Sequence, residues 1–187
     1  TLIRVGKVSI NGRVVSDLST EVKDSDKVRI GSRLIKLKKE FSMIVYNKQK
    51  GELVTKRDDR GRKTIYDSLP RGFSKFISVG RLDYASEGLL LLTDAPAIAQ
   101  ALMDSDIERE YYLKIKGNIT EQVINAMRDG FFAKDATKGA HAKTKQISME
   151  FKPFLAYKII SQSGGYTRLK VIISEGQNRE LRRFFGY

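Results

Sequence analysis

The residues best suited to chemistry lie in a polar loop between two apolar segments. Gly80 and Gly88 bracket this loop, and Arg81 and Asp83 stand inside it two positions apart. A loop anchored by rigid strands is a common place for catalytic groups, and a carboxylate placed there can act as a nucleophile. The alternative is a turn with a weak surface ion pair. Taken alone, the pattern favours the ion pair.

Two further segments carry candidate residues. Tyr111 and Tyr112 would lie on opposite faces of a strand, so one could stack on an unpaired base while the other enters the core. Residues 174–183 lead through a glycine turn into a basic helix, where Arg182 or Arg183 could pair with a carboxylate or with phosphate. The structural alternatives are half-buried strand tyrosines and a solvated basic face.

These segments require a frame of strands and short helices to position them. The hydrophobic pattern predicts strands at 43–46, 76–79, 89–93, 111–115, 148–151, 157–161 and 167–173, and helices near 65–69, 96–103, 120–130 and 180–185. Asn11-Gly12 and Gly164-Gly165 are typical of two-residue hairpin turns. Because strands outnumber helices and do not alternate with them regularly, we expect a mixed α+β fold rather than a doubly wound sheet.

Composition narrows the classes of function. The chain of 187 residues has 35 Lys and Arg against 22 Asp and Glu, a net charge of +13, and such an excess points to nucleic acid as the partner. With no cysteine, disulfides and thiol catalysis are excluded, and a single histidine, His141, excludes a multi-histidine metal site. The longest apolar run, residues 88–92, is far shorter than a membrane span.

The positive charge is concentrated near the N-terminus. Residues 1–39 contain ten Lys and Arg and four Asp and Glu, a net +6 in about a fifth of the chain. The pattern there is one of short strands and turns, and Lys38-Lys39-Glu40 is typical of a linker. We therefore expect one domain over residues 1–39 and a second over residues 40–187.

The segment from Gly80 to Thr93 resembles the signature of the RsuA-type ribosomal RNA pseudouridine synthases. Three more motifs of that family follow in order along residues 44–187: the loop from Lys48 to Thr64, Arg109-Glu110-Tyr111, and the stretch from Glu175 to Arg183. The resemblance implies a mainly antiparallel catalytic sheet with helices packed on it. Residues 1–39 resemble the second half of the alpha-L RNA-binding motif, a small α/β module. The first half of that module and the end of the catalytic domain are expected to be missing from this chain.

The resemblance also implies roles for individual residues. Asp83 would be the catalytic aspartate, Tyr111 would pack on the target uracil and help to move a proton, and Arg182 would pair with Asp83. Leu181 would line the apolar side of the pocket, and Arg81 would help to position the RNA backbone. Further RNA contacts are expected from Lys48, Lys50, Arg60, Arg62, Asn178, Arg179 and Arg183. Adjacent helical residues point about 100° apart, so only one of Arg182 and Arg183 can face the pocket.

The implied reaction converts a specific uridine of ribosomal RNA into pseudouridine. Because the net change is an isomerisation, no cofactor or metal is expected. The motifs favour large-subunit RNA, and the implied partner is ribosomal RNA or a pre-ribosomal particle in the bacterial cytoplasm, with no membrane and with the enzyme as a monomer. Three alternatives stay open: a synthase for small-subunit RNA, a non-catalytic RNA-binding or ribosome-assembly factor, and a DNA-binding protein.

Overall fold

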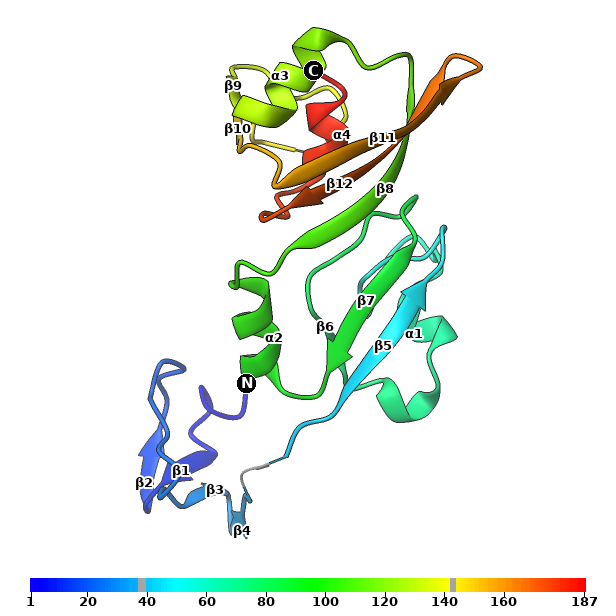
Figure 1. Ribbon diagram of the computed structural model, residues 1–187. Coiled ribbons are helices and arrows are strands. Elements are labelled where there is room, and N and C mark those ends of the chain that lie inside the picture. The colour runs from blue at the N-terminus through cyan, green and yellow to red at the C-terminus, as the bar shows by residue number, and fades with distance from the viewer. Residues whose placement is uncertain (37–39, 142–143) are drawn as a thin grey trace. The chain divides into compact units, whose positions relative to one another are not determined.

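The computed structural model describes residues 1–36, 40–141 and 144–187 (Figure 1). These residues form two compact units, Thr1–Met43 and Ile44–Tyr187. Lys38 and Lys39, which belong to the expected linker, lie outside the described residues. None of the helices within the described ranges combines the length and the apolar character needed to cross a membrane.

The first unit is a small antiparallel sheet. Its strands are β1 (Val8–Ile10), β2 (Arg13–Val15), β3 (Val28–Ile30) and β4 (Arg33–Leu34), in the order β2-β1-β3-β4. Asn11 and Gly12 join β1 to β2 with φ values of 51° and 84°, which confirms the predicted hairpin turn. Among the described residues of this unit, Val8 is the only buried apolar side chain, so the unit has little core of its own.

The polar loop at 80–88 grows out of the first sheet of the second unit. This sheet contains β5 (Met43–Lys48), β7 (Gly88–Thr93) and β6 (Ile77–Ser78), in that order. The helical segments nearby in sequence are α1 (Ile65–Ser68), η1 (Arg71–Phe73) and α2 (Pro96–Met103). Ile65, Phe76, Leu90 and Leu92 form a buried core, so the apolar run 88–92 is a strand, as the pattern predicts.

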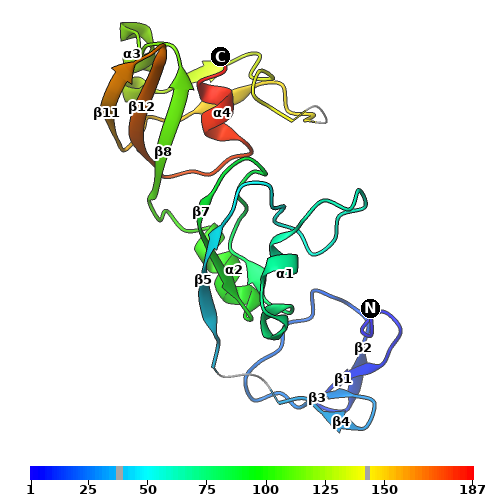
Figure 2. The ribbon, with the colours of Figure 1, turned by 90° about the vertical axis from the view of Figure 1, so that its right-hand side faces the viewer.

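A second sheet lies farther along the same unit. It consists of β11 (Ala156–Ser163), β12 (Tyr166–Ile173) and β8 (Arg109–Lys116), all antiparallel, with β12 in the middle. α3 (Glu121–Asp129) and α4 (Glu180–Phe184) pack on one face of this sheet (Figure 2), where a small β9 (Phe131–Ala133) and β10 (Met149–Phe151) ribbon completes the core. The expected α+β architecture with mainly antiparallel sheets is confirmed.

The adjacent residues Tyr111 and Tyr112 of β8 lie on opposite faces of the sheet. Tyr111 packs against the core formed with α3 and α4, whereas Tyr112 is 71% exposed on the other side of the sheet. The prediction that these residues lie on opposite faces is therefore confirmed. The face that carries Tyr111 is called the inner face below, and the face that carries Tyr112 the outer face.

The ammonium group of Lys48 fastens the polar loop to the end of β5. Lys48 is fully buried, and its Nζ donates hydrogen bonds to the carbonyl oxygens of Gln49 (3.0 Å), Asp83 (3.0 Å) and Ser86 (2.7 Å). Burial lowers the pKa of this ammonium, and the nearby carboxylates oppose that shift. Because all three donors are used inside the protein, the expectation that Lys48 contacts RNA is corrected: its contacts hold the loop.

A buried carboxylate joins β5 to α1. Glu52 accepts hydrogen bonds from the hydroxyl groups of Tyr46 (2.7 Å) and Ser68 (2.5 Å) and from the backbone N–H of Gln49 (3.2 Å), and it pairs with Lys63 at 3.2 Å. Burial raises the pKa of Glu52, but these hydrogen bonds outweigh burial and hold the pKa at about 2. The ionised form of Glu52 therefore stabilises this corner of the fold.

We expect the Lys48→Met variant to be destabilised by on the order of 2–3 kcal/mol, because three carbonyl groups lose their donor. The matched control is Lys50→Met, which removes an exposed ion pair with Glu87 and should cost under about 1 kcal/mol. Urea unfolding measures both values, and hydrogen exchange should show a faster amide at Ser86 only in the first variant. Equal losses of stability in the two variants would contradict the role of Lys48.

We expect Glu52→Gln to lower stability by about 2–3 kcal/mol at neutral pH. The folded pKa of about 2 lies below the usual 4.5, so the contribution of Glu52 is complete above pH 4.5 and is lost as the pH falls towards 2. Unfolding free energies of the native protein and the variant should therefore converge across that interval. The matched control is Glu87→Gln, which changes an exposed carboxylate and should cost under about 1 kcal/mol at neutral pH. A stability difference between the native protein and Glu52→Gln that does not change with pH would refute the assignment.

Candidate active site

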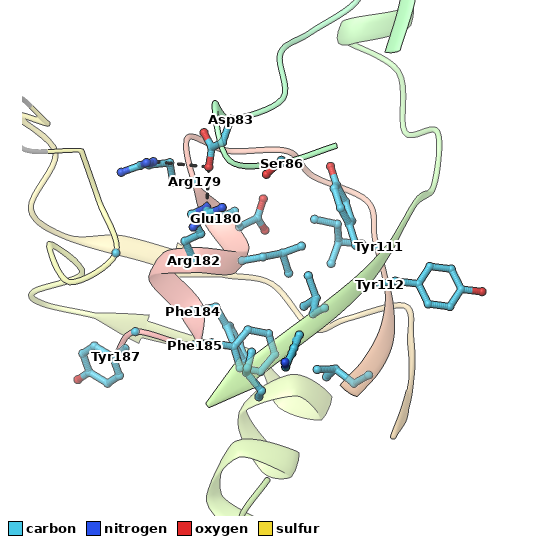
Figure 3. A pocket seen from close by; sticks show the side chains of 18 of the residues that line it. Asp83, Ser86, Tyr111, Tyr112, Arg179, Glu180, Arg182, Phe184, Phe185 and Tyr187 are labelled. Atoms are coloured by element: carbon cyan, nitrogen blue, oxygen red, sulfur yellow. Dashed lines mark hydrogen bonds and ion pairs between the residues drawn. The ribbon is translucent and has the colours of Figure 1, made fainter. Parts of the chain in front are cut away.

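A groove of about 1300 Å³ brings residues of all four sequence motifs together (Figure 3). Loop 80–88, strand β8 and helix α4 each contribute side chains to its walls. The sequence-predicted residues that line it are Asp83, Tyr111, Leu181, Arg182, Arg81, Lys50 and Arg179. Loop, strand and helix are thus far apart in the chain but share one solvent-accessible space.

Asp83 is held by two arginines from α4 and the turn before it. Its Oδ2 accepts a hydrogen bond from Nε of Arg182 at 2.9 Å and pairs with Nε of Arg179 at 3.5 Å. The Asp83 side chain is 28% exposed, so the carboxylate remains accessible from the groove. Its Oδ1 accepts no hydrogen bond from the described residues. One oxygen is therefore neutralised by guanidinium groups, while the other is left for a ligand.

The turn before α4 aims both arginines at the carboxylate. Arg179 has a left-handed backbone conformation, φ 54° and ψ 29°, which costs about 1–2 kcal/mol for a residue other than glycine. The carboxylate of Glu180 accepts the backbone N–H of Gln177 at 2.8 Å and closes this turn. Glu180 is buried, and burial raises its pKa.

Residue spacing alone predicts neither the Glu180–Gln177 hydrogen bond nor the Arg179–Asp83 ion pair. The only sequence signal for the role of Glu180 is an acidic residue at a helix start, which is a capping preference. Arg179 is expected from the sequence to contact RNA, whereas the structure places its guanidinium group beside the Asp83 carboxylate. Arg179 is thereby part of the electrostatic environment of the carboxylate.

Arg183 anchors the same helix on its other side. It is fully buried, with Nε donating to the carbonyl of Ala136 (2.7 Å) and Nη2 to that of Gln146 (2.9 Å). Gly139 packs directly against the carbonyl of Arg182, where a Cβ atom would collide. The expectation that Arg183 contacts RNA is therefore corrected. The rotation between successive helical residues turns Arg182 to the groove and Arg183 to the interior.

Tyr111 and Leu181 form the less polar part of the groove. The Tyr111 ring is half-buried and points towards the loop that carries Asp83 and Ser86 (Figure 3). Burial raises the pKa of its hydroxyl above 10, Arg109 opposes this shift, and the charges of Glu180 and Asp83 add to it. Tyr111 is therefore a neutral hydroxyl at physiological pH. Leu181 contacts the core and also lines the groove.

Two predicted RNA-binding cations stand at the groove. Arg81 is exposed and makes no ion pair with a described residue. Lys50 is exposed and pairs with Glu87 at 3.0 Å, an interaction that solvent screens strongly. Both side chains are positioned to meet a ligand that approaches Asp83.

The other predicted contacts lie outside the groove lining. Arg60 and Asn178 are exposed. Arg62 pairs with Asp58 of the same loop at 2.7 Å, and its guanidinium and backbone N–H groups hold the pKa of that carboxyl at about 2. Arg62 therefore shapes the loop that carries Arg60, and its charge is already partly compensated.

Known proteins resemble this chain over most of its length. The sequence profile of the family described as RNA pseudouridylate synthase matches residues 42–186. A Helicobacter pylori protein described as an uncharacterized RNA pseudouridine synthase is 51% identical over all of this chain and 71% of its own length. Ribosomal large subunit pseudouridine synthase B of Bacillus subtilis is 31% identical over 98% of this chain and 71% of its own length. The Vibrio cholerae protein of that name is 34% identical over 98% of this chain and 55% of its own length.

Solved structures share the fold. A crystal structure of a pseudouridylate synthase superposes with a TM-score of 0.60 at 24% identity, over 98% of this chain and 73% of its own. A chain of a Cbf5-Nop10-Gar1 complex superposes with a TM-score of 0.52 at 17% identity, over 76% of this chain and 43% of its own. The profile match, the Helicobacter pylori relative and the groove around Asp83 agree with the four motifs, and the chain belongs to the RNA pseudouridine synthase family.

Proposed function

We propose that this chain converts one uridine of large-subunit ribosomal RNA into pseudouridine, with Asp83 as the catalytic carboxylate and without a cofactor. The observation that carries the proposal is the Asp83 carboxylate, fixed by Arg182 at 2.9 Å in a groove that Tyr111 also lines. Relatives in Bacillus subtilis and Vibrio cholerae are named ribosomal large subunit pseudouridine synthase B. Their names support large-subunit RNA as the substrate.

The isomerisation exchanges one bond for another at the same ribose. The bond from uracil N1 to C1′ breaks, the base turns, and a bond forms from C5 to C1′. The proton on C5 is released and N1 takes up a proton, so no electrons are gained or lost. The Asp83 carboxylate can serve this sequence by attacking C1′, by attacking the uracil ring or by stabilising a path through a glycal. All three routes need the carboxylate in contact with the target nucleotide.

The groups around Asp83 suit this task. Arg182 and Arg179 stabilise its negative charge, and an arginine keeps its own charge throughout the physiological range. Tyr111, neutral and half-buried, presents a ring that can stack on uracil and a hydroxyl that can donate or relay a proton. Leu181 gives the base an apolar wall. A uracil bound here would be out of its stack, which is easiest in an RNA loop.

The remaining positive charge supports RNA binding. Arg81, Lys50, Arg60 and Asn178 are exposed around or near the groove and are proposed to contact phosphate or sugar groups. We also propose residues 1–39 as a separate RNA-docking domain, because they carry a net +6 and their described part exposes most of its cations. Such contacts are independent of sequence and weaken with salt.

The basic charge also fits one other function. A non-catalytic RNA-binding or ribosome-assembly factor would share the basic charge. It would not require a carboxylate held between Arg182 and Arg179 beside Tyr111, and this arrangement favours catalysis. Action on small-subunit RNA instead would be revealed by mapping pseudouridine in both ribosomal RNAs from a strain that lacks the gene.

We expect Asp83→Ala to reduce tritium release from ring-labelled uridine in ribosomal RNA on the order of 10³-fold or more. RNA affinity should stay within a few-fold, because the substitution removes no positive charge. The matched control is Asp59→Ala, which removes an exposed carboxylate and should leave the rate unchanged. An Asp83→Ala protein that releases tritium at the native rate would refute the catalytic role of Asp83.

We expect Tyr111→Phe to separate stacking from proton transfer. The phenylalanine ring keeps the stacking surface, so RNA affinity should be retained, while loss of the hydroxyl should lower the single-turnover rate by about 10²-fold if it moves a proton. Tyr84→Phe, at the exposed tyrosine that follows Asp83 in loop 80–88, is the control. An unchanged rate in Tyr111→Phe, together with a large loss in Tyr111→Ala, would leave stacking as the only role.

A further inference from the structure

The outer face of the second sheet carries cations and tyrosines in alternation. Its β8 and β12 positions are joined by three cross-strand pairs: Tyr112 with Lys170, Lys114 with Arg168, and Lys116 with Tyr166. Directly opposed side chains on one face lie about 5 Å apart. Five of the six side chains are exposed, and Lys170 is half-buried. Figure 2 shows no helix from the described part of the chain on this face, and the core with α3 and α4 lies on the other side.

The charges on this face are not balanced within the protein. Lys114 is directly opposite Arg168, and Lys158 of β11 is directly opposite Lys170. Like charges facing each other across strands are destabilising. Glu110 pairs with Lys170 at 2.7 Å, but Lys114, Lys158 and Arg168 make no ion pair with any described residue. A polyanion laid on this face would relieve the repulsion.

The two tyrosines offer stacking surfaces beside these cations. Tyr112 is 71% exposed and Tyr166 is 43% exposed. The ammonium of Lys114 lies 4.3 Å from the ring centroid of Tyr166, and that of Lys170 lies 6.0 Å from that of Tyr112. Aromatic rings interleaved with positive charge are the recognition surface for unpaired bases joined by phosphates. A duplex hides its base faces and cannot use the rings.

A hollow of about 280 Å³ lies on the same face beside Tyr166. The residues that line it are Lys114, Arg168, Tyr166, Ser161, Ser163 and Gly164. Two cations and two hydroxyl groups around a small hollow suit a phosphate group. Gly164, the first residue of the hairpin turn with φ 59°, is one of the lining residues.

The outer face is continuous with the groove that contains Asp83. β8 is at the edge of its sheet, and the groove is lined by Tyr111 from the inner face and by Tyr112, Lys114 and Lys116 from the outer face. An RNA strand can therefore pass from the groove around this edge.

We infer that the outer face of β8 and β12 binds a single-stranded segment of the substrate RNA that flanks the target uridine. Tyr112 and Tyr166 stack on bases, and Lys114 and Arg168 bind a phosphate in the hollow. The inference rests on the proposed RNA substrate and adds a second contact region to it. It predicts a preference for substrates with an unpaired tail next to the target loop.

The test measures binding of two fluorescein-labelled RNA hairpins that differ only in a short single-stranded tail. The native protein should bind the tailed hairpin more tightly than the blunt one. Tyr112→Ala combined with Tyr166→Ala should raise the Kd of the tailed hairpin about tenfold or more and leave the blunt one within twofold. The Phe versions of both substitutions should bind like the native protein.

The matched control is Tyr157→Ala, because Tyr157 lies opposite the buried Val171 and so belongs to the inner face. It should leave tailed and blunt binding equally unaffected. A second variant, Lys114→Gln with Arg168→Gln, should lower the slope of log K against log salt by about 1.4 for the tailed RNA. Circular dichroism checks that each variant is folded, and the Phe variants test stacking even where an Ala variant unfolds.

Native affinity of the Tyr112→Ala, Tyr166→Ala protein for the tailed hairpin would overturn the inference, as would equal competition by polyglutamate, which would indicate an acidic protein partner. The Asp83→Ala enzyme should keep its preference for the tail. If the Tyr112→Ala, Tyr166→Ala protein loses its preference for the tailed hairpin but the Asp83→Ala enzyme is active, only the catalytic role of Asp83 is refuted. If the Asp83→Ala enzyme is inactive but the native protein shows no preference for the tailed hairpin, only RNA binding by the outer face is refuted.

Discussion

The hydrogen bond between Asp83 and Arg182 joins segments 99 residues apart, and the groove depends on both ends being held. Buried cations hold them. Lys48 binds the loop of Asp83 through two of its carbonyl groups, those of Asp83 and Ser86. Arg183 fixes α4 through two backbone carbonyls of a distant segment. A small misplacement of either segment would separate the carboxylate from its guanidinium partners, and positioning errors of about 1 Å are costly in catalysis.

Positive charge has two distinct uses in this protein. Lys48 and Arg183 are desolvated, and both donate hydrogen bonds to backbone carbonyl oxygens, as buried polar groups need partners. Nearby carboxylates also stabilise the charge of Lys48. Arg81, Lys114 and Arg168 are exposed and make no ion pair with a described residue, so their charge is available to RNA phosphate. The net charge of +13 therefore overstates the charge that can bind RNA, and the placement of each cation decides its use.

The two faces of β8 are proposed to bind different parts of the RNA. Tyr111 lies beside Asp83 at the groove, while Tyr112, the next residue, is exposed among cations. Strand alternation makes this division automatic, since one residue step reverses the direction of the side chain. One strand can thus present an aromatic ring to the target uracil on one side and another to flanking nucleotides on the other, with its free edge as the path between them.

The sequence by itself determined four features. Periodicity predicted the α+β class and the opposite faces of Tyr111 and Tyr112, glycine-containing pairs predicted both hairpin turns, and helix geometry allowed only one of Arg182 and Arg183 to face the pocket. The motifs identified the loop of Asp83. Only the tertiary structure decided that Lys48 and Arg183 are interior anchors, that Arg179 pairs with Asp83, and that Glu180 closes the turn before α4. The reason is physical: local pattern sets which side of an element a residue occupies, but the partner of a charged side chain is whichever distant carbonyl or carboxylate the fold brings within hydrogen-bond reach.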